Sequence, residues 1–221
     1  MPVAAAPQAN DIRISQVYGG GGNTGATYKN DFIELFNAGT TTVDVTGWSV
    51  QYASATGTGA WAGLTVLSGF IAPGQYYLIK EAPGTGGTVE LPTPDITGTL
   101  AMGASNGKVA LVSNAVLLNG QCPTGLIDLV GYGTANCYEG SGAAPALSNT
   151  TAALRHAEGC VDTDNNNADF TATAPTPRNS ASPTYSCSTP SSTLTVNKTG
   201  PATVLPGASY AYTLTVQNAT G

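Results

Sequence analysis

Charged side chains are scarce in this chain, and their scarcity excludes several kinds of protein. Asp, Glu, Lys and Arg make up 9% of the 221 residues, and only seven residues are basic. No two basic residues are neighbours, so the sequence has no basic stripe for a phosphate backbone. The net charge of −6 also disfavours docking to anionic membranes. The sequence therefore carries no strong signal for a nucleic-acid or membrane partner.

Long hydrophobic runs and long amphipathic helical patterns are missing as well. No apolar stretch reaches the roughly 20 residues that cross a bilayer. Residues 1–10 lack the charged start and the apolar run of an intact signal peptide, so we interpret them as a flexible arm. Abundant glycine, proline and threonine together with little charge predict a secreted all-β protein.

Metal-binding spacing is absent among the histidines and cysteines. His156 is the single histidine, and none of the four cysteines forms a C-x-x-C pair, which argues against structural zinc. Two disulfides are the better interpretation, and they imply an oxidising compartment. Of the three pairings that four cysteines allow, we favour Cys122–Cys137 and Cys160–Cys187, because each closes a local, loop-rich segment. A closed loop of about 15 residues stabilises by roughly 3 kcal/mol in the chain-entropy model.

Short alternating segments separated by turn residues predict a β-sandwich. The pattern is clearest at residues 30–37, where alternate side chains face opposite sides and both sides are largely apolar. We therefore place this strand in the middle of the core. Other strands are expected at residues 11–17, 42–45, 48–52, 64–66, 76–79, 99–100, 108–112 and 126–132.

Composition divides the chain into segments. The sandwich is expected over residues 11–172, with irregular structure from residue 133 onward. Residues 173–192 are rich in threonine, proline and serine and are interpreted as a linker. Alternation resumes in residues 193–221, which we interpret as the truncated start of a second immunoglobulin-like β-domain. Two or three strands cannot close a core of their own.

Two glycine motifs match enzyme signatures only in letters. Residues 20–25 fit G-x-G-x-x-G, but a dinucleotide site needs a helix after the glycines and a strand is expected here. Residues 103–107 fit G-x-S-x-G, but a nucleophile elbow needs a helix after the serine, and a strand follows again. We interpret both motifs as loops between strands, although the first one could still contact a partner.

The densest group of oxygen ligands is Asp162, Asp164, Asn166 and Asp169. The spacing begins like an EF-hand, but the glycine at the sixth position and the acid at the twelfth are missing. Calcium in another geometry is one interpretation of this group. The other is a loop of Asx turns, in which Asp162 or Asp164 pairs with Arg155 and anchors the loop to the sandwich.

Glu34 is the acid of the central strand. One interpretation is a buried acid with a raised pKa, or a metal ligand shared with the glycine loop of residues 19–25. A lone carboxylate does little chemistry, so we prefer a structural role in which Glu34 braces that loop or pairs with Lys29. Trp48 is expected in the core, whereas Trp61 lies in a Gly/Ala loop and is the better candidate for an exposed aromatic.

The order of these segments resembles the lamin-tail domain, an immunoglobulin-like sandwich. The resemblance covers roughly residues 10–180. Its tail at residues 162–170, followed by 175–179, is similar to the bacterial extracellular form. The other stretches that carry it are Ile14–Tyr18, Asp31–Asn37, Gly47–Val50, Ile71–Ile79 and Ile127–Gly133.

This resemblance implies a non-catalytic, secreted module that binds or anchors a larger extracellular protein. The expected partner is an extracellular protein, a glycan or a cell-surface component, with no cofactor unless calcium binds. In bacteria, such domains are similar to the N-terminal modules of secreted proteins, often extracellular nucleases with a separate catalytic domain. Two alternatives follow: an accessory domain of a secreted nuclease, or a structural module of a cell-surface or matrix protein built from repeats.

Overall fold

The computed structural model describes residues 11–187, 193–201, 203, 205–207, 209 and 211–219. The chain divides into two units at residue 187, and each unit is described by itself. The predicted flexible arm at residues 1–10 and part of the predicted linker lie outside the described residues. Within the described residues, no helix has the length and apolar character of a membrane span.

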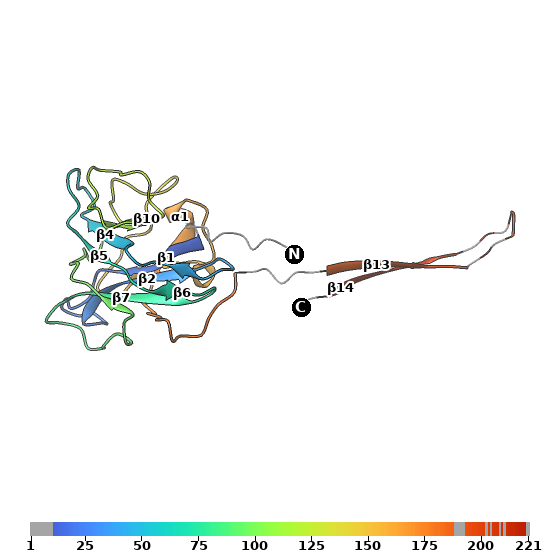
Figure 1. The fold of residues 1–221 in the computed structure, drawn as a ribbon, viewed down its shortest axis with the longest axis horizontal. Coiled ribbons are helices and arrows are strands. Elements are labelled where there is room, and N and C mark those ends of the chain that lie inside the picture. Colours follow the sequence, from blue (N-terminus) through green and yellow to red (C-terminus); the bar gives the residue numbers. More distant parts are fainter. Residues whose placement is uncertain are drawn as a thin grey trace. The chain divides into compact units, whose positions relative to one another are not determined.

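The first unit contains two main β-sheets (Figure 1). The six-stranded sheet has the order β12-β11-β1-β2-β7-β8, built from β1 (Ile12–Tyr18), β2 (Asn30–Asn37), β7 (Tyr76–Pro83), β8 (Ile96–Thr97), β11 (Ala152–Arg155) and β12 (Phe170–Thr173). The four-stranded sheet has the order β10-β9-β4-β5, built from β4 (Ser49–Ala53), β5 (Gly63–Val66), β9 (Gly107–Val112) and β10 (Asp128–Tyr132). A small pair joins β3 (Val43–Asp44) to β6 (Phe70–Ile71), and the short helices are η2 (Ala157–Gly159) and α1 (Asn166–Asp169). The predicted all-β sandwich is confirmed.

The main core lies between the two sheets, and β2 runs through the middle of the larger one. Ile33 and Leu35 of β2 share a buried cluster with Val50 of β4 and Leu111 of β9. Phe32 points to the opposite face and joins a second buried cluster. Every residue of β2 is buried, as predicted. Burial of each such apolar side chain stabilises the fold by about 1.5–3 kcal/mol.

Two strands lie where irregular structure was expected. β11 and β12 pair with each other and extend the larger sheet beyond β1. AALR has no alternation of apolar and polar residues, and FTAT alternates over only four residues, the lower limit of a recognisable strand. The expected strand at residues 99–100 is instead β8, at Ile96–Thr97.

The predicted linker begins later than its composition indicates. Residues 173–186 belong to the first unit, and we call residues 174–186 the strap. Gln16 of β1 donates to the Thr176 carbonyl oxygen (2.7 Å) and accepts from the Thr176 backbone N–H (3.1 Å). Further along, the Tyr185 N–H donates to the Gly74 carbonyl oxygen (2.9 Å). Proline and threonine suit an extended strap fixed by hydrogen bonds as well as they suit a free linker.

The second unit contains a β-hairpin of β13 (Thr193–Thr199) and β14 (Thr213–Ala219). Val196 pairs with Val216, and Lys198 pairs with Leu214. The three apolar side chains therefore share one face, where each is about 55% exposed. The other face carries threonine and asparagine. The second immunoglobulin-like domain stays a prediction, and this amphipathic hairpin agrees with it.

Truncation tests the boundary of the first unit. We expect a chain ending at Cys187 to melt within about 2 °C of the full chain, because the strap stays in place. The strap also carries Arg178, whose Nη2 lies 2.8 Å from the carboxylate of buried Glu34. A chain ending at residue 172 loses this partner, and breaking such a buried pair costs about 3–5 kcal/mol. At roughly 2–4 °C per kcal/mol, its melting temperature falls by about 6 °C or more in differential scanning calorimetry.

The control for this truncation separates the strap from a lost disulfide. A 1–187 chain with Cys160→Ser and Cys187→Ser reports the effect of the cysteines alone. If the 1–172 chain is as stable as this control, residues 173–186 are a linker after all.

Candidate functional site

A completely buried arginine, Arg155 of β11, joins segments from both sheets. Its Nη2 donates to both carboxylate oxygens of Asp128 on β10 (3.0 and 2.8 Å). Nη1 donates to Asp162 (2.9 Å), and Nε donates to the carbonyl oxygen of Ile14 on β1 (2.9 Å). The ring of Phe170 lies 4.5 Å from the guanidinium carbon. We call this group the Arg155 cluster.

The Arg155 cluster also provides hydrogen-bond partners for the backbone of Ile14, where β1 is irregular. The register between β1 and β2 shifts between Ile14 and Gln16, and the Ile14 N–H donates to Asp128 Oδ2 (2.6 Å). Asp128 and Arg155 thus take up both backbone groups of Ile14. Burial acts to lower the Arg155 pKa, but the surrounding carboxylates outweigh it and raise that pKa above its usual value. Arg155 therefore stays charged.

Two of the four predicted calcium ligands hold the loop itself. Asp169 accepts hydrogen bonds from the Thr163 N–H (2.9 Å), the Thr163 hydroxyl (2.7 Å) and the Asn165 N–H (3.2 Å). These donors lie four and six residues before Asp169, so the bonds are not those of an Asx turn, in which the side chain bonds the backbone two residues ahead. They agree with the broader interpretation that an acid of this loop bonds the loop's own backbone. Asp162 pairs with Arg155, so the loop is anchored to the sandwich.

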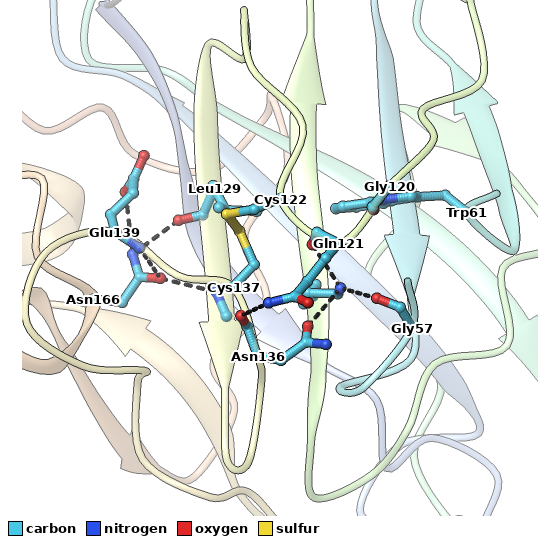
Figure 2. Close-up of a disulfide and its surroundings, with 12 residues drawn as sticks. Gly57, Trp61, Gly120, Gln121, Cys122, Leu129, Asn136, Cys137, Glu139 and Asn166 are labelled. Atoms are coloured by element: carbon cyan, nitrogen blue, oxygen red, sulfur yellow. Dashed lines mark hydrogen bonds between the residues drawn. A yellow bond between two sulfur atoms is a disulfide. The ribbon is translucent and has the colours of Figure 1, made fainter. Parts of the chain in front are cut away.

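Asn166, another predicted ligand, closes the outer edge of β10 (Figure 2). Its Oδ1 accepts from the N–H groups of Gly131 (2.8 Å) and Glu139 (3.3 Å). Its Nδ2 donates to the Leu129 carbonyl oxygen (2.8 Å) and to the Glu139 carboxylate (3.1 Å). The amide takes the place of a neighbouring strand, so Asn166 is fully occupied by protein groups.

A different set of three acids gathers beside this loop. Carboxylate oxygens of Asp162, Asp164 and Glu139 lie within 4.8 Å of one another. Burial, followed by the negative charge of Asp128, raises the pKa of Glu139 to about 8. Asp162 and Asp164 were predicted as ligands, whereas Glu139 replaces Asn166 and Asp169. Calcium binding stays a prediction.

Thermal shifts in calcium test this prediction. A site of these three carboxylates with a dissociation constant near ~1 mM is stabilised by about 1.4 kcal/mol in 10 mM calcium, or about 3–6 °C. The shift should be larger at pH 9 than at pH 7, because Glu139 must lose its proton to bind. Glu139→Gln should abolish the shift. An unchanged melting temperature at both pH values would rule out the site.

Glu34 does not brace the glycine loop as expected. It is fully buried and accepts from the Ser15 hydroxyl (2.6 Å), the Gln16 amide (2.9 Å), and the Arg178 N–H (2.7 Å) and Nη2 (2.8 Å). Its partner is thus Arg178 of the strap, and Lys29 does not pair with it. Lys29 lies 2.5 Å from Glu90 instead. The sequence offered no local signal for Arg178, which lies 144 positions away.

Arg178 also packs on an aromatic ring. Its guanidinium carbon lies 3.7 Å from the ring centroid of Tyr76, and Nη1 donates to the Tyr76 hydroxyl (2.8 Å) and to Glu158. Burial acts to lower the Arg178 pKa, but Glu34 outweighs it and raises that pKa. The stack and the ion pair together fix the strap on the outer face of the larger sheet.

Asp31, not Glu34, braces the glycine loop. Its carboxylate accepts from the N–H groups of Gly21 and Met102, each at 2.8 Å, and burial raises its pKa to about 7. The loop then packs backbone to backbone, since a Cβ on Gly22 would lie 2.1 Å from the Gly84 nitrogen. The glycines therefore serve close chain approach rather than phosphate binding.

The G-x-S-x-G stretch is a loop that leads into β9. Gly103 donates its N–H to the Tyr52 hydroxyl and accepts from the Tyr132 hydroxyl, each at 2.8 Å. Ser105 accepts from the Asn106 amide (3.0 Å). A strand follows the serine, as expected.

Trp61 is buried, so the expectation of an exposed aromatic is wrong. It is 3% exposed, and its Nε1 donates to the Gly120 carbonyl oxygen (3.2 Å) (Figure 2). Its loop folds back because Ala60 pairs with Asn119 in an isolated β-bridge. Trp48 is half-buried and packs against the main core, where it was expected.

Beside Trp61, Lys108 of β9 is buried without an acidic partner among its hydrogen bonds. Its Nζ donates to the carbonyl oxygens of Gly57 (2.8 Å) and Gln121 (2.9 Å) and to Asn136 Oδ1 (2.8 Å). Burial lowers its pKa. Cys122 and Cys137, next to two of these partners, form the predicted disulfide (Figure 2). Cys160 and Cys187 are disulfide-bonded as well.

Glu81 of β7 connects the sheets at the opposite edge. Its carboxylate accepts from the Thr65 hydroxyl on β5 (2.6 Å) and from the Leu100 N–H (2.8 Å). Among the ion pairs of the described residues none involves Glu81, and burial raises its pKa to about 7.

An open groove lies on the outer face of β11 and β12 beside the strap. Its volume is about 420 Å³, within the range of ligand sites. Ala157 and Glu158 on its rim have φ values of 49° and 60°, a backbone conformation that costs about 1–3 kcal/mol per residue. No sequence motif marked this groove. Its polar lining includes His156, Glu158, Thr171, Thr173, Thr176 and Arg178.

These features define an immunoglobulin-like β-sandwich whose buried charges hold its own segments together. A family model described as the Lamin Tail Domain matches residues 5–165, and the chain belongs to this family. The lamin tail domain is a non-catalytic, immunoglobulin-like domain. The family resemblance identified from the sequence is therefore confirmed.

A solved structure supports the same fold. It is the crystal structure, at 2.50 Å resolution, of a DUF4876 family protein from Bacteroides thetaiotaomicron VPI-5482. The two chains have a TM-score of 0.53 and 12% sequence identity, over 81% of this chain and 75% of that chain. At this identity the likeness concerns the fold alone. No curated protein sequence matches this chain.

The raised pKa of Glu81 predicts a pH dependence of stability. The folded state holds the Glu81 proton up to about pH 7, whereas in the unfolded state the group has its ordinary pKa of 4.5. The contribution of protonated Glu81 to the free energy of unfolding is therefore complete below pH 4.5 and is lost as the pH rises through about 7. When the pH is raised from 5 to 8.5, the free energy of unfolding should fall in the wild type by about 1–3 kcal/mol more than it falls in Glu81→Gln, which has no carboxyl group to ionise. Urea unfolding at both pH values measures this difference. Parallel pH dependence in the two proteins would contradict the assignment.

Proposed function

We propose that this lamin tail domain is a non-catalytic binding or anchoring module of a larger secreted protein. Four disulfide-bonded cysteines support an oxidising, extracellular location. The observation that carries the proposal is the groove beside the strap, which places polar side chains at an open surface.

The contrast between buried and exposed polar groups favours this groove as the binding site. The carboxylates of Asp31, Glu34, Glu81 and Asp128 each accept hydrogen bonds from the protein's own groups. These carboxylates stabilise the fold. None of them forms a hydrogen bond with a histidine among the described residues, as a catalytic acid–base pair would. His156 and the groove threonines are exposed instead.

The amphipathic hairpin of the second unit favours one alternative. The exposed apolar face of Val196, Leu214 and Val216 suits further β-structure. This supports a role in a cell-surface or matrix protein with several β-domains. The nuclease alternative rests on the family resemblance alone.

Probe libraries test the binding proposal. The full chain is immobilised and exposed to a glycan array and to a phage-displayed library of random linear 12-residue peptides. We expect reproducible binders that are lost in Thr173→Glu, which puts a charge into the groove. Thr58→Glu, at an exposed loop position away from the groove lining, is the matched control and should keep them. Binders that survive Thr173→Glu, or no binders at all, would overturn the proposal.

A further inference from the structure

We infer that the groove receives an extended peptide segment of a partner protein, which adds a strand to the free edge of β12. This inference rests on the proposed binding function and names its ligand. Strand addition draws affinity from main-chain hydrogen bonds and specificity from pockets for alternate side chains.

No strand among the described residues pairs with the outer edge of β12. β12 is the last strand in the order of the larger sheet. The His156 N–H donates to the Asp169 carbonyl oxygen (2.9 Å), and this bond sets the alternation along the β11–β12 pair. Thr171 and Thr173 then direct their backbone groups to β11, whereas Ala172 directs its N–H and C=O outward.

The far edge of the smaller sheet is closed by comparison. Asn166 bonds the backbone of Gly131 and Leu129 on β10. The Ala144 N–H also donates to the Gly131 carbonyl oxygen (2.8 Å). Proteins usually protect free strand edges in this way. No hydrogen bond within the described part of the chain takes up the outward backbone groups of Ala172, so a partner strand can pair there.

The strap leaves this edge uncovered. Thr176 bonds Gln16 of β1 through both its N–H and its C=O. The chain therefore turns inward after β12 and crosses the outer face of the sheet. This crossing forms one wall of the groove.

The groove offers a place for the side chains of an added strand. Thr171 pairs with Leu154, and Thr173 pairs with Ala152, so these side chains share the outer face. Alternate residues of a strand added to β12 would stand beside the two threonines, on the side away from Leu154. Small, β-branched side chains fit such a row best.

Charge narrows the peptide further. Glu158 on the rim is 55% exposed, and the charge of Arg178 is already balanced by Glu34 and Glu158. The whole chain carries −6. The segment is therefore neutral or basic, with a lysine or arginine directed toward Glu158, and acidic segments are disfavoured.

Peptides recovered from the 12-residue library are the probe. Each peptide is synthesised in three forms: unmodified, with N-methyl groups on its odd-numbered residues, and with N-methyl groups on its even-numbered residues. The last two forms are the two phases of methylation. One phase should weaken binding to the full chain at least tenfold in calorimetry, because it removes the donors that face β12, and the other should not. The protein stays unchanged in this comparison.

Two measurements on the protein complete the test. Ala172→Pro removes the outward N–H without removing a bond to β11, and should weaken binding at least tenfold. By hydrogen exchange, the Ala172 amide should exchange fast in the free protein and slowly in the complex. Circular dichroism shows whether the proline variant is folded. If it is not, the N-methylated peptides and hydrogen exchange, both measured on the unchanged protein, decide whether a strand is added.

The outcomes separate the two proposals. Binding that Thr173→Glu abolishes, but that neither N-methyl phase changes, would overturn strand addition and leave the groove as a binding site. Binding of glycans but not peptides through the groove would do the same. Loss of every groove-dependent binder would overturn the proposed function itself.

Discussion

The fold depends on one buried guanidinium. Arg155 touches β10, β1 and the loop that precedes β12, and it reaches both sheets. Removing it would leave Asp128 as an uncompensated buried charge, which typically costs 3–5 kcal/mol. The ion pair also takes up the backbone groups that the β1 irregularity frees. A packing error at this point would therefore disturb strand register as well as charge.

Local pattern predicted the frame of the domain well, because burial on both faces leaves a readable alternation. The central strand at residues 30–37 shows this best. The sites were harder, because their partners are remote in sequence. Glu34 is visible in its strand, but nothing near it points to Arg178. β12 was missed because its alternation of apolar and polar residues lasts only four residues, FTAT, inside a segment that otherwise reads as irregular.

Residues near the end of the domain that resemble ligands in sequence instead bond other segments of the domain. Asp169 and Asn166 bond the loop and the edge of β10, and Arg178 bonds the central strand. Acids and amides that serve the backbone resemble metal ligands in sequence, because both roles need oxygen atoms at close spacing. Only the placement of the strands tells the roles apart. The groove is lined partly by Thr176 and Arg178 of the tail stretch 175–179, but the other lining residues on β11 and β12 belong to none of the stretches that carry the resemblance.

The ion pair between Glu34 and Arg178 has a consequence for how the domain forms. Its members lie 144 positions apart, so the central strand emerges during synthesis long before its partner. Until Arg178 arrives, closing the outer face would bury an unpaired carboxylate. The outer face of the central strand can therefore reach its charge-paired form only after Arg178 has been synthesised.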